Sequence, residues 1–124
     1  MSTELHRILD RPLMTFSVPD EISRLKQGEQ WSRTRRAALT LAKNADLRLV
    51  LVLLSEGMDI HEHQAEGPIT VSVAMGALKF SAAGEEHTLD AGALLSLGGG
   101  IPHSVHALEE CAFIVTVIQP PRAE

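Results

Sequence analysis

The sequence is poor in cysteine and in long apolar runs, and each shortage excludes a class of protein. Cys111 is the only cysteine of 124 residues, so an intramolecular disulfide and a four-thiolate zinc site are both excluded, and a reducing cytoplasm is the expected setting. The apolar run Leu49–Leu54 is far shorter than the roughly 20 residues that cross a bilayer, and the N-terminus lacks a signal-peptide pattern. We therefore expect a soluble, cytoplasmic protein without membrane contact.

Aromatic and clustered basic residues are also scarce. Tyrosine is absent and aromatic residues make up 3% of the chain, which leaves little for stacking on bases or sugars and indicates a small substrate. Residues 41–124 carry 4 basic and 11 acidic side chains. The nearest approach to a basic cluster is Arg33, Arg35 and Arg36 beside Trp31, which we interpret as a solvated strand edge, so nucleic acid is not an expected partner.

The remaining pattern is that of one domain with an N-terminal extension, since 124 residues do not hold two cores. Residues 1–18 show no periodicity and predict an extended arm. The stretch from Pro19 to Gly28 begins with proline and two acids, as a helix start does, and predicts about two turns of helix. We therefore assign residues 1–34 to an arm and a short helix, and residues 35–120 to the main body.

Short apolar segments fill the main body and predict strands. Leu39 and Leu41 alternate in a first strand, 47–54 form a second, and residues 43–46 supply a turn that makes the two a hairpin. Further strands are expected around residues 69–73, 78–80, 93–97 and 113–117, separated by glycine and aspartate turns. Many short strands at regular spacing predict an all-β sandwich or barrel, with no helix beyond residue 30.

Histidines are the residues of this body with the clearest chemistry. His61 and His63 are two apart on an expected strand, so regular alternation directs both imidazoles to one face, close enough to share a metal ion. His103 follows a glycine-rich turn and opens another strand, which a closed barrel could bring opposite the pair. By itself, a His-x-His pair is weak evidence for a metal site, because such pairs are more often surface or core histidines.

Two motifs in order extend this pattern. The first, residues 57–76, holds a glycine, the His61–His63 pair, Glu66 and a closing glycine; the second, residues 92–107, holds Gly92, five further residues, Gly98-Gly99-Gly100-Ile101-Pro102 and His103. Together they resemble the two conserved motifs of the cupin superfamily. Three positions depart from the pattern: Gly98 replaces a proline, Ala107 an asparagine, and Glu66 stands one residue early.

The resemblance implies a double-stranded β-helix, or jelly-roll barrel, with a metal ion held inside it. The ligands carried over are His61, His63 and His103, with Glu66 either a fourth ligand or a solvated turn carboxylate. Three imidazoles suit Zn, Fe, Ni or Cu, whereas hard Mn(II) is less suited where the carboxylate is lost. The resemblance also implies a homodimer, to which the arm and the exposed strand edges would contribute.

Other candidate residues are interpreted as supporting or structural. Asp59 shares the expected strand face of His61 and could orient an imidazole, or it is a solvated carboxylate. His106 and His87 are expected at the surface, and Cys111 as a buried, inert thiol.

Three functions remain open at this point. The first is a metal-dependent enzyme, an oxygenase or an isomerase, acting on a small polar metabolite. The second is a non-catalytic cupin that binds a small ligand or a metal as a sensor or store. The third is a structural or partner-binding barrel, which the retention of all three motif histidines disfavours.

Overall fold

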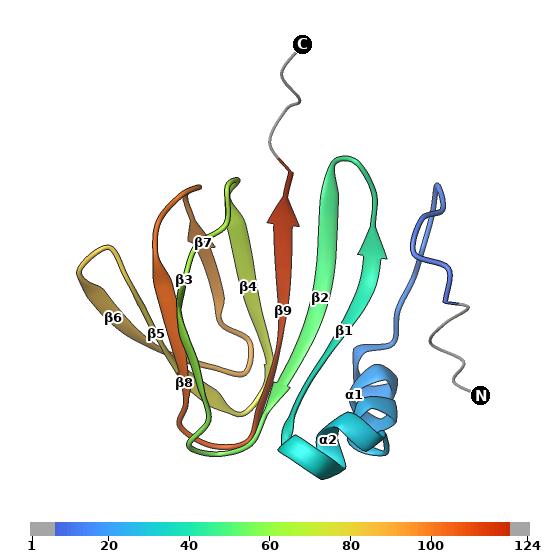
Figure 1. The fold of residues 1–124 in the computed structure, drawn as a ribbon, viewed down its shortest axis with the longest axis horizontal. Helices are drawn as coiled ribbons and strands as arrows, with labels where there is room; N and C mark the ends of the chain where they lie inside the picture. The colour runs from blue at the N-terminus through green and yellow to red at the C-terminus, as the bar shows by residue number, and fades with distance from the viewer. Residues whose placement is uncertain (1–6, 120–124) are drawn as a thin grey trace.

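The computed structural model describes residues 7–119, which form two antiparallel β-sheets preceded by two short helices (Figure 1). The helices are α1 (Val18–Lys26) and α2 (Glu29–Thr34). The strands of the five-stranded sheet, in spatial order, are β1 (Arg36–Lys43), β2 (Leu47–Leu54), β9 (Cys111–Ile118), β4 (Ile69–Met75) and β7 (Leu94–Leu97). Those of the four-stranded sheet are β3 (Asp59–His63), β8 (His103–Ala107), β5 (Ala77–Ala82) and β6 (Glu85–Asp90). The all-β fold class predicted from the strand rhythm is confirmed.

The first two strands form the predicted hairpin. β1 pairs antiparallel with β2 from Arg36↔Leu54 to Lys43↔Arg48. In the turn, the Asn44 side-chain oxygen accepts hydrogen bonds from the backbone N–H groups of Asp46 (2.8 Å) and Leu47 (3.0 Å). An asparagine side chain that accepts hydrogen bonds from the backbone N–H groups just after it often closes such a turn. The local sequence therefore explains this turn.

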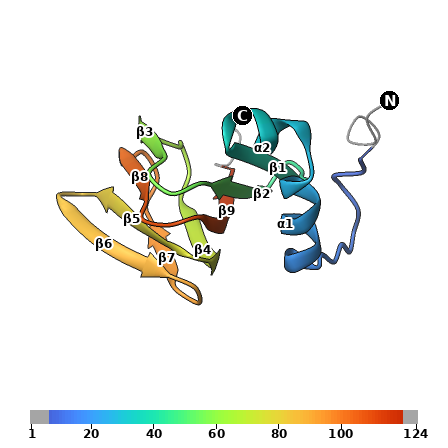
Figure 2. The ribbon, with the colours of Figure 1, turned by 90° about the horizontal axis from the view of Figure 1, so that it is seen from below.

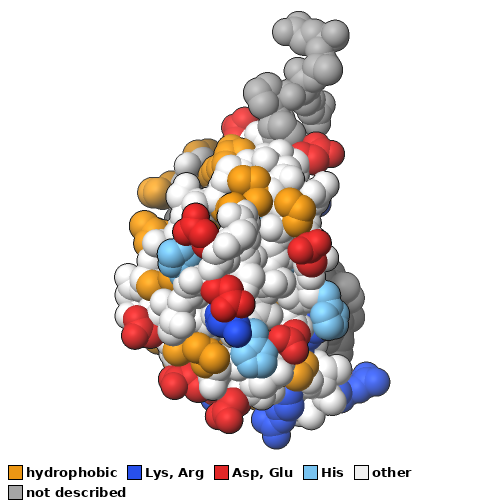
Figure 3. Space-filling view, turned by 90° about the vertical axis from the view of Figure 1, so that its left-hand side faces the viewer, with side chains coloured by type: hydrophobic (Ala, Val, Ile, Leu, Met, Phe, Trp, Pro, Cys, Tyr) orange, Lys and Arg blue, Asp and Glu red, His pale blue; other side chains and the backbone are white. Residues whose placement is uncertain are grey.

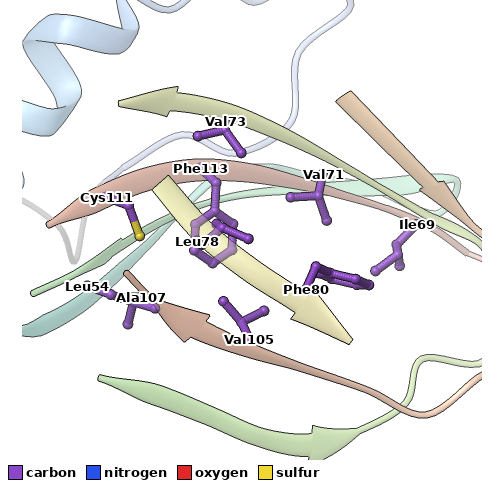
Figure 4. Packing of buried hydrophobic residues seen from close by; sticks show 10 residues of the cluster. All are labelled: Leu54, Ile69, Val71, Val73, Leu78, Phe80, Val105, Ala107, Cys111 and Phe113. Atoms are coloured by element: carbon purple, nitrogen blue, oxygen red, sulfur yellow. The ribbon is translucent and has the colours of Figure 1, made fainter. Parts of the chain in front are cut away.

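One hydrophobic core lies between the two sheets (Figure 4). From the five-stranded sheet, β4 contributes Ile69, Val71 and Val73 at alternate positions, and β9 contributes Phe113, which is 1% exposed. From the four-stranded sheet, β5 contributes Leu78 and Phe80 and β8 contributes Val105 and Ala107. Each large side chain buried in this way stabilises the fold by about 1.5–3 kcal/mol.

A second core lies on the other face of the five-stranded sheet, where α1 and α2 cover it (Figure 2). Leu51 and Leu53 of β2 face the helices, whereas Leu54 of the same strand belongs to the core between the sheets. β2 is therefore apolar on both faces, which explains why the run Leu49–Leu54 does not alternate with polar residues.

The predicted helix is present as α1, and a second helix that was not expected follows it. Ser17 caps α1 by accepting a hydrogen bond from the Asp20 N–H (3.4 Å), and α1 ends just before Gly28. The expectation of no helix beyond residue 30 is wrong, because α2 follows at once and ends where Arg35 adopts a left-handed φ of 58°. Trp31 on α2 is 2% exposed in the second core. Burial of this one large side chain stabilises a helix too short to persist alone.

The N-terminal arm packs on its own chain. The Lys43 N–H donates to the Leu9 carbonyl oxygen (2.9 Å), and the Arg7 guanidinium lies 3.1 Å from the Glu21 carboxylate of α1. The division into residues 1–34 and 35–120 stays a prediction, and its residues 1–6 and 120 lie outside the described range. Neither helix of residues 7–119 has the length and apolar character needed to span a bilayer.

Candidate metal and ligand site

Two of the three motif histidines meet at one end of the barrel. His63 ends β3 and His103 begins β8, and the two residues are register partners in the four-stranded sheet. Their ring centroids are 4.2 Å apart, with the ring planes inclined by 60°. His103 is 5% exposed, and Phe80 stacks on its ring at a centroid distance of 5.5 Å. The fold thus holds the two imidazoles side by side and fixes the His103 ring.

Both imidazoles are anchored through the same ring nitrogen. The Nδ1 of His63 lies 3.1 Å from the carbonyl oxygen of His61, and the Nδ1 of His103 lies 3.0 Å from that of Ile101. A carbonyl oxygen only accepts, so each Nδ1 carries the proton and donates it. In the neutral ring this leaves Nε2 with a free lone pair, which is the arrangement found in metal-binding histidines.

A pocket of about 370 Å³ adjoins these rings. Its walls combine aliphatic side chains of β4 and β9 with polar side chains of β2 and of the loop after β3. Besides the two histidines, the lining residues are Arg48, Gln64, Ala65, Glu66, Gly67, Ile69, Val115, Val117 and Gln119. Glu66 therefore lies in the same pocket as His63, because the loop at Gly67 bends the chain away from strand alternation.

The loops of the two motifs hold each other in place beside this pocket. The Gly100 N–H donates to the Ala65 carbonyl oxygen at 2.7 Å. Gly99 lies so close to the first loop that an added Cβ would be 2.4 Å from the Glu66 carbonyl oxygen. Because Gly99 has no side chain, the second motif can pack directly against the backbone of Glu66 and Gly67 in the first motif.

The structure places His61 apart from the other two motif histidines. The β3–β8 register shifts between Ile60 and His63, which interrupts regular alternation at this pair. His61 lines a separate surface pocket with Asp59, Lys79 and His106, among others. Within residues 7–119, no group of three or more His, Cys, Asp or Glu side chains is arranged to hold a metal ion. The three-histidine metal site stays a prediction.

The other two histidines of the four-stranded sheet lie on opposite faces of it. His106 lies on the outer face, whereas His87 lies on the inner face of the edge strand β6, opposite Phe80. The Asp59 Oδ1 lies 2.6 Å from His106 Nδ1, so this carboxylate orients His106, which is not a motif ligand. His87 pairs with Glu85 at 2.8 Å and is exposed. Figure 3 shows histidine side chains among acidic side chains on the side of the molecule formed by the four-stranded sheet. His87 and His106 are therefore surface residues, as the sequence predicts.

Cys111 is the buried, inert thiol that the sequence predicts. Its side chain is 0% exposed in the core between the sheets. Burial, with smaller contributions from the charges of Glu109 and Glu110, raises the pKa of the thiol from 9.0 to about 11. Since the thiolate is the nucleophile, a catalytic role for this cysteine is disfavoured.

Arg48 is the pocket residue that the sequence analysis missed. Its Nε is buried and has no hydrogen-bond partner among residues 7–119. The available signal was a single charge within the otherwise apolar strand Leu47–Leu54, which an alternation pattern alone does not distinguish from a strand end.

Comparisons with known proteins agree on the fold. No protein-family model and no curated protein matches the sequence. Among solved structures, a cupin-2 domain protein from Shewanella frigidimarina is similar with a TM-score of 0.65 and 21% identity, over 86% of this chain and 94% of that chain. KdgF from a Halomonas species has a TM-score of 0.61 and 25% identity, over 70% of this chain and 80% of that one.

A larger enzyme shares the same fold in part. Salicylate 1,2-dioxygenase from Pseudoaminobacter salicylatoxidans, solved in adducts with gentisate, has a TM-score of 0.72 and 15% identity. The match covers 82% of this chain but 32% of the dioxygenase chain. The two sequence motifs and the two-sheet barrel agree with these structural similarities. This chain has the fold of the cupin superfamily.

Proposed function

We propose that the protein binds a divalent transition-metal ion at the His63–His103 end of the barrel and uses it to hold a small polar metabolite, as an oxygenase or an isomerase. One observation carries the proposal: the two imidazole rings lie 4.2 Å apart, each with Nδ1 anchored on a backbone carbonyl. This geometry leaves two Nε2 lone pairs for a shared ion. Imidazole nitrogen suits Zn, Fe, Ni or Cu better than Mn.

The residues present fit such an ion in part, since a stable site needs three or four protein ligands. Glu66 lines the same pocket, and His61 is the residue whose carbonyl anchors His63. Both side chains are exposed, so they can change rotamer without disturbing the core. We propose that Glu66 and His61 complete the site when the ion binds.

The chain's own residues would divide the remaining work. Ile69, Val115 and Val117 give the pocket an aliphatic wall that excludes water from one side of a bound molecule. The Glu66 carboxylate can accept a proton if it is not occupied as a ligand. A bound divalent ion would polarise a substrate oxygen or lower the pKa of a bound water to about 7.

A non-catalytic sensor or storage cupin is the second candidate. One observation favours it: Glu66 is the only carboxylate in the pocket lining within residues 7–119. If Glu66 ligates the ion, no second carboxylate of that lining remains to carry a proton, and binding without turnover is the simpler role. Retention of one bound small molecule without conversion would support this candidate.

We also propose a homodimer in the cytoplasm. β1 is an edge strand, and residues 7–119 cover only parts of it: the Leu9 carbonyl oxygen accepts from the Lys43 N–H, and the Gln30 side chain accepts from the Ala38 N–H at 3.2 Å. An unpaired strand edge favours pairing with a second copy. Light scattering at micromolar concentration that gives the mass of one chain would contradict the dimer.

A titration with Co²⁺ tests the metal proposal. The wild-type protein should develop visible absorption bands that saturate at one ion per chain, because one site per chain is proposed. His63→Ala and His103→Ala should lose the bands, whereas His87→Ala, an exposed histidine outside the pocket, should retain them. Loss in His61→Ala or Glu66→Gln identifies the completing ligands. Equal spectra from wild type and His63→Ala would contradict the proposal.

A further inference from the structure

Arg48 is placed on the inner face of the barrel. On β2, Val52 and Leu54 pack in the core between the sheets, and Arg48 lies on the same face because strand side chains alternate. Its register partner on β9 is Val117, which also packs against that core and lines the pocket. A positive charge therefore stands at the end of an apolar strand face, beside the two imidazoles.

Among residues 7–119, the buried Nε of Arg48 has no partner. No carboxylate of those residues lies within ion-pair distance of the guanidinium. A guanidinium keeps its charge at any ordinary pH, so it cannot relieve its burial by losing a proton. A permanently charged donor that has no acceptor within residues 7–119 and stands in a pocket wall favours an anionic acceptor from outside the chain.

The rest of the pocket limits what that anion can be. A planar fork of N–H donors matches a carboxylate, which accepts two parallel bonds. The aliphatic wall of Ile69, Val115 and Val117 suits a short carbon skeleton, and about 370 Å³ admits only a small molecule. The His63 and His103 rings offer a second polar contact across the same pocket.

We infer that this pocket binds a small aliphatic carboxylate bearing a hydroxyl or carbonyl oxygen, with its carboxylate on Arg48 and its second oxygen toward His63 and His103. The inference deepens the proposed function, on which it rests for the role of the pocket, by naming the ligand class. The carboxylate contact itself requires no metal ion, so the two can be tested separately.

The test is an NMR titration of chelator-treated protein with lactate, pyruvate and 3-hydroxybutyrate, each compared with its neutral amide. At least one acid should bind in the millimolar range or tighter and shift the Arg48 Nε–H resonance, and its amide should bind at least about tenfold more weakly. Arg48→Gln should weaken the acid by a similar factor, and Arg33→Gln, an exposed arginine of α2, should leave it unchanged. Equal affinity for acid and amide, or no binding by any acid, would overturn the inference.

Thermal melting provides a second readout that a purely structural arginine would not give. Arg48→Leu removes the unpaired charge, so the ligand-free variant should melt at or above the wild-type temperature, and the acid should raise the melting temperature of the wild type only. A lower melting temperature for ligand-free Arg48→Leu would show that Arg48 has a structural partner and would overturn the inference. Metal binding that persists in Arg48→Gln while the acid is lost separates this inference from the metal proposal.

Discussion

Substitution of Gly99 by alanine tests whether close packing of the two motif loops builds the site. A Cβ added at Gly99 would lie 2.4 Å from the Glu66 carbonyl oxygen and 3.0 Å from the Gly67 carbonyl carbon. Both neighbours are backbone atoms, so a rotamer change cannot relieve the contact. One loop must move by about 1 Å to reach an ordinary separation of about 3.4 Å.

The neighbouring glycine supplies a matched control. A Cβ at Gly98 would lie 3.4 Å from Ile101 Cδ1, the flexible end of a side chain, and neither Gly98 nor Gly99 has a positive φ. Gly98→Ala therefore meets no backbone clash and restricts the unfolded chain, which stabilises a protein by about 0.4–1 kcal/mol. Overpacking at Gly99 should destabilise it by about 1–3 kcal/mol.

Calorimetry and Co²⁺ titration measure the two consequences. For a chain of this length, each kcal/mol shifts the melting temperature by about 4 °C, so Gly99→Ala should melt about 4–12 °C below wild type and Gly98→Ala at or slightly above it. Because one loop carries Glu66 and the other leads into His103, displacement of either loop should also make Gly99→Ala bind Co²⁺ more weakly. Melting temperatures of the two variants that agree within about 1 °C would refute the reasoning.

Three further predictions concern the cores. Cys111 in the folded protein should resist iodoacetamide at pH 8 and react once the chain is unfolded in urea. Because the folded thiol has the higher pKa, the free energy of unfolding should fall by about 2 kcal/mol as the pH rises from 9 to about 11, and urea unfolding at several pH values measures this loss. Phe113→Ala, which empties the centre of the core between the sheets, should reduce the free energy of unfolding by about 3–5 kcal/mol in urea, and a loss below about 1 kcal/mol would contradict the packing described. The single tryptophan, Trp31, should emit at short wavelength in the folded protein, and its unfolding transition should coincide with that of the strands by circular dichroism; an earlier fluorescence transition would show that the helices detach first.

The sequence predicted the parts of the fold that local chemistry determines. The hairpin follows from the Asn44 turn between apolar strands, and α1 follows from proline and acids in its first turn. α2 was not predictable in this way, because its six residues form a helix only where Trp31 can be buried against β1 and β2. Tertiary packing, absent from any local pattern, determines that element.

In the site, too, some residues were predictable from the sequence and others depend on tertiary structure. His103 and Glu66 were singled out from motif spacing, and both line the pocket that contains His63. The expectation that His61 and His63 share a face assumed a regular strand, and the register shift after Ile60 interrupts that regularity. Arg48 gave no motif signal, because its significance depends on which strand lies beside β9.

The central claim is that the His63–His103 end of the barrel holds a metal ion, and elemental analysis of freshly purified protein tests it most directly. Wild type and His63→Ala would be purified in parallel without added metal. The account predicts about one transition-metal ion per chain in the wild type and its loss in His63→Ala. No metal in either protein, together with no uptake on titration, would contradict it and leave a barrel that binds its ligand without metal.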